Sequence, residues 1–104
     1  MKWSKEEILS KIKGQLIVSC QALPSEPLYV EEKSVMYLMA RAAKQAGSPC
    51  IRTSSIRDVK AIKEETGLPV IGIIKINYDG YDSYITPTMK EVDQLAEADS
   101  DIVA

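Results

Sequence analysis

The segment VIGIIK, residues 70–75, is an uninterrupted apolar run that ends in a lysine. Two earlier segments have the same form, LIVSCQ at residues 16–21 and CIR at residues 50–52. Continuous apolar runs are typical of strands covered on both faces, as in parallel sheets. The polar residues that end the three runs are Gln21, Arg52 and Lys75. The carboxyl ends of parallel strands meet at one face, so these three side chains are expected there together.

Stretches with helical periodicity separate the apolar runs. Ser4 with Glu7 and Thr88 with Glu91 have the spacing of capping boxes. Helices are predicted over residues 4–12, 31–45, 55–66 and from 88 onward, and strands over residues 16–21, 49–53, 70–75 and from 101 onward. The order β-α-β-α-β-loop-α-β predicts an α/β fold with a parallel sheet, in which residues 1–13 form an N-terminal helix and residues 14–104 the βα units.

Composition narrows the functional classes. The 104 residues carry a formal net charge of −2 and no block of like charge, which argues against nucleic acid as the main partner. No apolar run approaches a membrane span, and the first residues lack a signal core, so no membrane association and a cytoplasmic location are expected. Cys20 and Cys50 have no metal spacing, and the chain has no histidine, so both are interpreted as packing residues and no metal is expected.

Side chains alternate along a strand, so the row that each polar residue shares can be predicted. These rows are Gln21 with Ser19 and Ile17, Arg52 with Cys50 and Ser54, and Lys75 with Ile73 and Ile71. Structural roles remain possible for each residue. Lys75 could be a solvated strand end and Gln21 could cap loop backbone. Arg52 could pair with Glu64, Glu65 or Asp58. The tyrosine-rich segment 78–84 could cover a strand mouth or act as a lid.

The strings GQLIVSCQALPSEPL, AIKEETGLPVIGIIK and YITPTMKEVDQL resemble bacterial N-acetylmannosamine-6-phosphate 2-epimerases, and the likeness covers residues 14–104. The resemblance implies a (β/α)₈ TIM barrel, of which this chain holds the first three βα units and the start of strand four. It also implies interconversion of N-acetylmannosamine 6-phosphate and N-acetylglucosamine 6-phosphate, in sialic acid and amino-sugar catabolism, without a cofactor. Lys75 matches the catalytic lysine, Gln21 and Arg52 match substrate-binding positions, and Tyr84 and Thr86 lie in the matching YIT string.

The implied chemistry suits these residue types. Epimerisation at C2 removes and replaces a proton beside the C1 aldehyde of the open-chain sugar, and a lysine can carry that proton. Arg52 or Gln21 could stabilise the enolate oxygen. The chain departs from the family pattern at Tyr29, where a histidine is common, at Ile76, where a second cation is common, and in the polar residues after Arg52.

Half a barrel lacks parts that the complete site needs. The family's acidic catalytic partner and its phosphate-binding loops come from later strands, so the chain alone is expected to be nearly inactive. The open sheet would expose Ile17, Ile71 and Ile73, which predicts self-association or pairing with a complementary C-terminal half. The chain could be a truncated copy, one half of a split enzyme or part of a longer sequence. The alternative from another class is a small non-catalytic α/β binding domain.

Overall fold

Four helices alternate with four strands in the computed structural model, which describes residues 3–104. The elements are α1 (Lys5–Ile12), β1 (Val18–Ser19), α2 (Met36–Gln45), β2 (Ile51–Ser54), α3 (Ile56–Thr66), β3 (Val70–Ile73), α4 (Met89–Glu97) and β4 (Ile102–Val103). None of the helices in these residues is long and apolar enough to cross a membrane.

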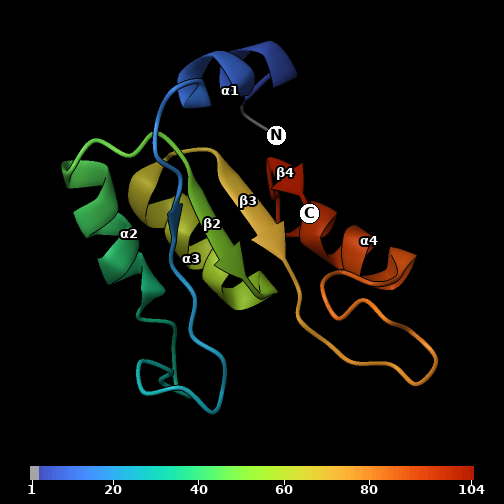
Figure 1. Cartoon of the computed structure of the whole chain (residues 1–104). Helices are drawn as coiled ribbons and strands as arrows, with labels where there is room; N and C mark the ends of the chain where they lie inside the picture. The colour runs from blue at the N-terminus through green and yellow to red at the C-terminus, as the bar shows by residue number, and fades with distance from the viewer. Residues whose placement is uncertain (1–2) are drawn as a thin grey trace.

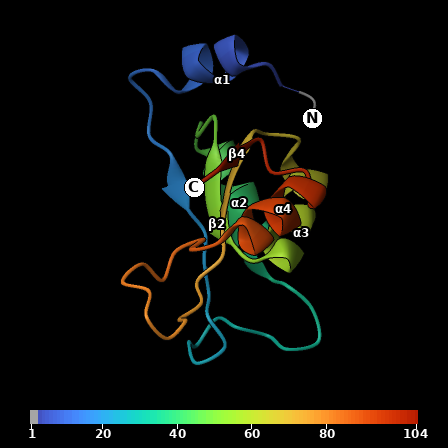
Figure 2. The ribbon, with the colours of Figure 1, turned by 90° about the vertical axis from the view of Figure 1, so that its right-hand side faces the viewer.

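The strands form one parallel sheet in the order β1-β2-β3-β4, so each strand pairs with its sequence neighbour (Figure 1). The register places Ser19 opposite Arg52, and Arg52 opposite Ile71. Helices α2, α3 and α4 lie against one face of the sheet, whereas the other face carries no helix (Figure 2). The predicted α/β class and the parallel sheet are therefore confirmed.

The hydrophobic core lies between the sheet and its helices. Alternate strand residues such as Cys20, Ile51 and Val70 are fully buried there. The helices contribute Met36, Ala40, Ala43, Val59, Ile62, Leu95 and Ala98 to the same cluster. Because this cluster uses one side of each strand, the neighbouring residues of the same strands point to the open face.

Local capping signals fixed several helix ends as predicted. The hydroxyl of Ser4 accepts from Glu7 N while the Glu7 carboxylate accepts from Ser4 N, and Thr88 with Glu91 forms a second capping box. The Ser55 hydroxyl accepts from Asp58 N at the start of α3. Gly67 ends α3 at φ 65°, a left-handed conformation that glycine adopts without steric cost.

The start of α2 was predicted five residues too early. Residues 31–35 are not helical, because Arg57 Nη1 donates to the backbone carbonyls of Val30 and Glu31 and holds this stretch in a loop. The Ser34 hydroxyl then accepts from Met36 N at the first turn of α2. The strands are also shorter than predicted, most of all β1, which keeps two residues in the ladder.

The expected exposure of the open face is only partly correct. Ile17 and Ile71 are half-buried, but Ile73 is fully buried. The segment after β3 folds back beside this strand, since Lys75 pairs with Ile85 in an antiparallel bridge. Of the methionines on the helices, Met36 is buried in the core, whereas Met39 and Met89 are exposed.

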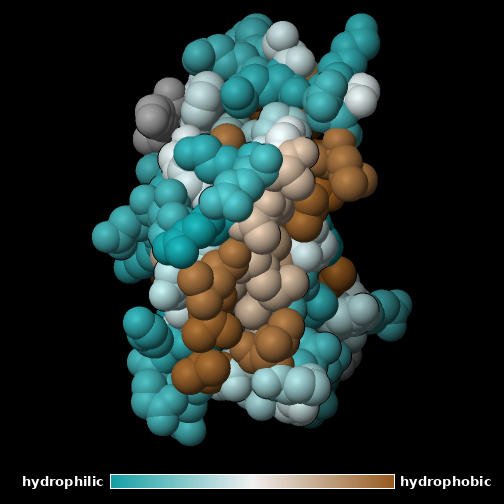
Figure 3. All heavy atoms as spheres, turned by 90° about the vertical axis from the view of Figure 1, so that its left-hand side faces the viewer, coloured by the Kyte–Doolittle hydropathy of each residue, from teal (hydrophilic) through white to brown (hydrophobic). Residues whose placement is uncertain are grey.

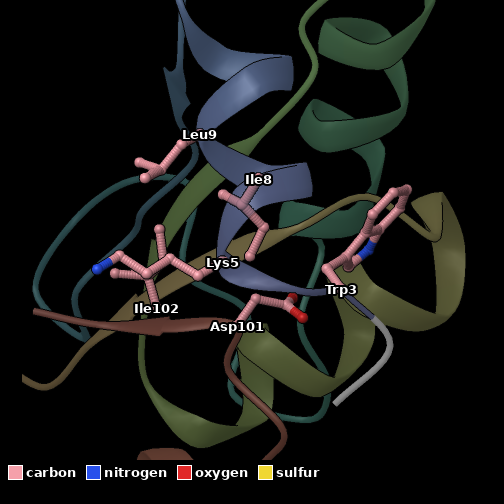
Figure 4. A pocket seen from close by; sticks show the side chains of 6 residues that line it. All are labelled: Trp3, Lys5, Ile8, Leu9, Asp101 and Ile102. Atoms are coloured by element: carbon pink, nitrogen blue, oxygen red, sulfur yellow. The ribbon is translucent and has the colours of Figure 1, made fainter.

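Helix α1 lies across the amino ends of the strands (Figure 1). It encloses with β4 a cavity of about 130 Å³ lined by Trp3, Lys5, Ile8, Leu9, Asp101 and Ile102 (Figure 4). Asp101 Oδ2 accepts from Lys63 Nζ at 2.8 Å and from Val70 N at 2.9 Å. This carboxylate therefore ties α3 to the starts of β3 and β4.

An apolar band covers the side of the molecule formed by α2 and the neighbouring β1 segment (Figure 3). Its exposed apolar side chains include Leu16, Leu38 and Met39. Strand β1 is also an edge of the sheet, as β4 is at the other side. Unpaired parallel edges of this kind are paired in a closed barrel.

Candidate active site at the carboxyl ends of the strands

Gln21, Arg52 and Lys75 share the open face of the sheet. The register pairs the row of Ser19 and Gln21 with the row of Arg52. On β3, Ile74 packs against the helix-side core, so Lys75 points to the opposite side. All three side chains are half-buried. The predicted shared face is therefore confirmed by the geometry, while the roles of the residues stay predictions.

Arg52 and Lys75 are left without acidic partners. Within residues 3–104, neither side chain makes an ion pair or a hydrogen bond. Two of the acidic residues suggested for Arg52 pair elsewhere, Glu65 with Arg41 at 3.1 Å and Asp58 with Arg57 at 3.4 Å. The ion-pair interpretation of Arg52 is thus wrong for the described residues. Two unpaired cations on the open face of the sheet favour an anionic or developing-anion ligand.

Gln21 is held by its own strand. Its Nε2 donates at 2.8 Å to the hydroxyl of Ser19, the preceding residue in the same row. The expectation that Gln21 caps loop backbone is therefore wrong. This bond fixes the direction of the side chain and leaves the amide oxygen as a possible acceptor on the open face.

The segment after β3 forms a loop that is closed by antiparallel pairing. Ile76 N donates to Tyr84 O at 2.9 Å, and Thr86 N donates to Ile74 O at 2.7 Å. Further out, Tyr78 Oη donates to Glu91 Oε2 at 2.8 Å. The loop therefore starts and ends beside Lys75 and is anchored to the first turn of α4.

Tyr84 and Thr86 do not join the other three predicted residues. Ile85 lies opposite Lys75, so alternation turns its two neighbours away from the Lys75 side. Tyr84 is exposed. The Thr86 hydroxyl accepts from Ile74 N and donates to the Ala104 carbonyl, so it links the ends of β3 and β4. These contacts give Thr86 a structural role at the edge of the site.

A cavity of about 230 Å³ opens beside Lys75 at the carboxyl ends of β1, β2 and β3. Its wall consists of Ala22, Leu23, Pro24, Tyr29, Ser54, Ser55, Arg57, Ile74 and Lys75. Only Lys75 of the predicted site residues lines it. For the other lining residues, the sequence offered one signal: the two serines Ser54 and Ser55 follow an apolar run.

Arg57 fixes the loop that roofs this cavity. Its guanidinium lies 4.6 Å from the centroid of the Tyr29 ring and donates to the Val30 carbonyl at 2.8 Å. The buried Asp58 carboxylate lies against the same group. This combination of stacking, hydrogen bonding and charge holds the β1–α2 loop over the end of β2.

The two cysteines take no part in the site. Both are fully buried, and burial raises the pKa of the Cys50 thiol to about 11 and also raises the pKa of Cys20. Protonated thiols are poor nucleophiles at neutral pH. Their interpretation as packing residues agrees with these surroundings. Within residues 3–104, no group of three or more histidine, cysteine or acidic side chains is placed to hold a metal ion.

The fold matches part of a solved structure. This structure is described as a structural and biochemical characterization of the N-acetylmannosamine-6-phosphate 2-epimerase from Clostridium perfringens. It superposes with a TM-score of 0.89 at 48% identity, over 99% of this chain and 44% of that one. The class of the protein follows: its four successive βα-linked strands are part of a TIM barrel, with the polar strand ends on the inner face.

A family model described as "Putative N-acetylmannosamine-6-phosphate epimerase" matches residues 36–104. The chain belongs to this family. A Clostridium perfringens (strain ATCC 13124) protein with the corresponding 2-epimerase name is 54% identical over 97 residues, and one from Caldanaerobacter subterraneus subsp. tengcongensis is 51% identical over 98 residues. The alignments cover 93% and 94% of this chain but only 43% and 40% of those proteins.

Proposed function

We propose that this chain contributes the first half of the active site of an N-acetylmannosamine-6-phosphate 2-epimerase. The observation that carries the proposal is the pair of unpartnered cations, Arg52 and Lys75, on the inner face of a barrel segment from this family. The substrate is an open-chain N-acetyl amino sugar phosphate. The reaction interconverts N-acetylmannosamine 6-phosphate and N-acetylglucosamine 6-phosphate without a cofactor.

In the proposed mechanism, Lys75 acts as the base that takes the proton from C2. The electron pair of the broken C–H bond moves onto the C1 aldehyde oxygen and forms an enolate. Arg52 stabilises the negative oxygen, and Gln21, held by Ser19, orients the substrate. Return of a proton to the other face of C2 completes the inversion. Tyr84 and Thr86 remain weaker candidates at the edge of the site.

Residues beyond this chain supply the rest of the proposed site. Epimerisation needs an acid or base on the second face of C2 and an anchor for the phosphate, and TIM barrels place phosphate sites after their last strands. We propose that a complementary C-terminal half provides both, covering the open face and the apolar band around Leu38 and Met39. A cytoplasmic location and a place in sialic acid catabolism belong to the same proposal.

The proposed function is tested by proton exchange. The purified chain is mixed with the C-terminal half of the Clostridium perfringens relative in D₂O, and deuterium entering C2 of N-acetylmannosamine 6-phosphate is followed by NMR. We expect exchange only when both halves are present. Lys75→Ala should lower its rate by roughly 10²- to 10⁴-fold, the usual contribution of a general acid or base.

Lys60→Ala, an exposed lysine on α3, is the matched control and should leave the rate unchanged. Exchange at the wild-type rate in Lys75→Ala would contradict the role of Lys75. Sugar phosphate binding without any exchange in the assembled halves would favour the non-catalytic binding domain instead.

A further inference from the structure

The backbone beside Lys75 is held by the loop that follows β3, rather than by the parallel sheet. Strand β3 ends at Ile73, whose carbonyl accepts from Ser55 N on the β2 side at 2.9 Å. The next residue, Ile74, is bonded at both backbone groups by Thr86. The Thr86 hydroxyl accepts from Ile74 N at 3.1 Å, and Thr86 N donates to Ile74 O at 2.7 Å. The position of Lys75 therefore depends on the returning arm of this loop.

This loop, residues 76–88, has little apolar packing of its own. It extends from the end of β3 before it returns to α4 (Figure 1). None of its residues is fully buried, and none belongs to the hydrophobic core cluster. A segment with so little buried apolar surface keeps its conformation mainly through its hydrogen bonds. The hydrogen bonds that close the loop therefore also fix the backbone at Lys75.

One buried carboxylate binds both arms of the loop. Glu91, in the first turn of α4, is fully buried. Its Oε1 accepts from Thr88 N at 3.0 Å and from the Thr88 hydroxyl at 2.6 Å, at the end of the returning arm. Its Oε2 accepts from the Tyr78 hydroxyl at 2.8 Å, on the outgoing arm that begins after Lys75. Hydrogen bonds to a carboxylate are stronger than bonds between neutral groups, so Glu91 joins the two arms firmly.

Helix capping explains only half of this arrangement. A capping box requires the bond from the N-cap backbone to one carboxylate oxygen, and Glu91 Oε1 accepts that bond from Thr88. The capping box of α1 shows the difference. There Glu7 is exposed, and within residues 3–104 its carboxylate accepts from Ser4 alone. The burial of Glu91 and its bond to Tyr78 thus serve the loop and not the helix end.

We propose that Glu91 and Tyr78 are positioning residues for Lys75. Glu91 holds the two arms of the loop together, and Tyr78 carries this constraint to the backbone just after Lys75. Neither residue contacts the substrate. The inference rests on the proposed function, because it takes Lys75 to be the base at C2. A displacement of a catalytic group by about 1 Å can lower a rate by roughly 10²-fold, so the loop matters to proton transfer even where it adds little to stability.

The first test uses the two-half proton-exchange assay of the proposed function. Tyr78→Phe removes the hydroxyl and leaves the capping box of Glu91 intact. It should lower the exchange rate at saturating N-acetylmannosamine 6-phosphate by roughly 10- to 100-fold, because a misplaced base slows proton transfer. Affinity for the sugar phosphate should stay within about twofold of the wild type, since the change does not affect ground-state binding.

Tyr81→Phe is the matched control for this variant. Tyr81 lies in the same loop, and its ring packs against that of Tyr78 with a centroid distance of 5.8 Å. Its hydroxyl makes no hydrogen bond within residues 3–104, so its removal should leave both the rate and the affinity unchanged. Glu91→Gln keeps an oxygen for Thr88 but replaces the second carboxylate oxygen by an amide, and it should lower the rate as Tyr78→Phe does.

A double substitution tests whether the effect acts through Lys75. In the Lys75→Ala background, Tyr78→Phe should cause no further loss of rate, because the base that it positions is absent. A purely structural role would lower the rate in both backgrounds by the same factor. Equal losses with and without Lys75 would therefore overturn the proposal.

Hydrogen exchange on the chain alone tests the loop without substrate. The amides of Ile76 and Thr86 are bonded across the two arms. Their protection should fall about tenfold in Tyr78→Phe, the usual effect of losing a hydrogen bond to a charged group. The amide of Cys20, which donates to Arg52 O in the sheet, should keep its protection.

The outcomes separate this inference from the function on which it rests. Unchanged protection of Ile76 and Thr86 in Tyr78→Phe would overturn the proposal, as would exchange at C2 at the wild-type rate. In both cases the role of Lys75 would stand. If the assembled wild-type halves show no exchange at C2, the proposed function is wrong, and the positioning roles of Glu91 and Tyr78 are wrong with it.

Discussion

The two faces of the sheet are built by alternate residues of the same strands, yet they differ in how completely their side chains are buried and paired. On the helix side, Ile51 and Val70 are fully buried in a closed core. On the open side, Arg52 and Lys75 are half-buried cations without partners in the described residues. The helix side is thus a closed core, and the open side retains charged groups that are in contact with solvent and free to pair with a ligand or a further segment.

The largest effect on stability is expected from substitutions of two neighbouring residues on β2, one that adds a charge on the helix side and one that removes a charge on the open side. Ile51→Asp places an unpaired charge in the core and should cost more than about 4 kcal/mol, enough to abolish folding of a marginal domain. Arg52→Leu removes a cation from the open side and should change the free energy of unfolding by less than about 1 kcal/mol. Thermal unfolding followed by circular dichroism measures both. Equal losses would show that the two faces do not differ in this way.

A smaller effect is expected where α4 approaches β3. A Cβ at Gly72 would lie 2.3 Å from Ser100 Oγ and 3.0 Å from Leu95 Cδ2, so Gly72→Ala forces the packed layer apart. We expect a loss of about 1–3 kcal/mol in the free energy of unfolding, measured by urea denaturation.

Ser100 offers the control for this site. Its hydroxyl is buried and has no hydrogen-bond partner among residues 3–104, so Ser100→Ala alone should be close to neutral. Combined with Gly72→Ala, it removes the shortest contact and should restore part of the lost stability. Strict additivity of the two changes would contradict the assignment of the loss to this contact.

The smallest effect is expected in the loop that links β3 to α4. Hydrogen bonds from Thr88 and Tyr78 hold the pKa of Glu91 below its ordinary value, and the Glu91 carboxylate raises the pKa of Tyr78. The bond therefore stabilises the fold above the ordinary glutamate pKa of about 4.3, and this contribution is lost as the pH falls through the lowered pKa of Glu91. It is also lost at high pH as Tyr78 ionises through its raised pKa.

Glu91→Gln should therefore be less stable than the wild type at neutral pH, with a difference that shrinks toward acid and toward strong base. Urea midpoints across the pH range measure this profile. Glu97→Gln, at the exposed end of α4, is the matched control and should show no such dependence. The interval from about pH 3 to about pH 11 includes the ordinary pKa values of glutamate and tyrosine. A stability difference between the two proteins that stays constant over this interval would exclude the assignment to this bond.

Sequence reasoning succeeded where the determinants are local. The capping boxes at Ser4 and Thr88 and the stop at Gly67 depend on residues within one turn, and alternation along each run was sufficient to assign Gln21, Arg52 and Lys75 to one face. It failed where the local structure depends on a side chain from a distant part of the sequence. The start of α2 depends on Arg57, which comes from another helix and bonds to the carbonyls of residues 30 and 31.

The cavity could not be predicted for the same reason. Its wall combines Ala22, Ser54 and Ile74 from three strand ends with the Tyr29 ring, and no spacing in the chain relates these positions. The placement of Tyr84 and Thr86 away from Lys75 likewise depends on the antiparallel pairing with Ile85. Family resemblance suggested these two residues, whereas their geometry follows from the loop.

The sequential order of the strands has a consequence for how the chain acquires its structure. Among β1 to β4, each strand pairs with its sequence neighbour. Pairing of sequence neighbours costs less loop-closure entropy than pairing of strands far apart in the chain. The sheet can therefore grow one βα unit at a time in the order in which the chain is synthesised, and the face that carries Arg52 and Lys75 is complete once β3 has paired.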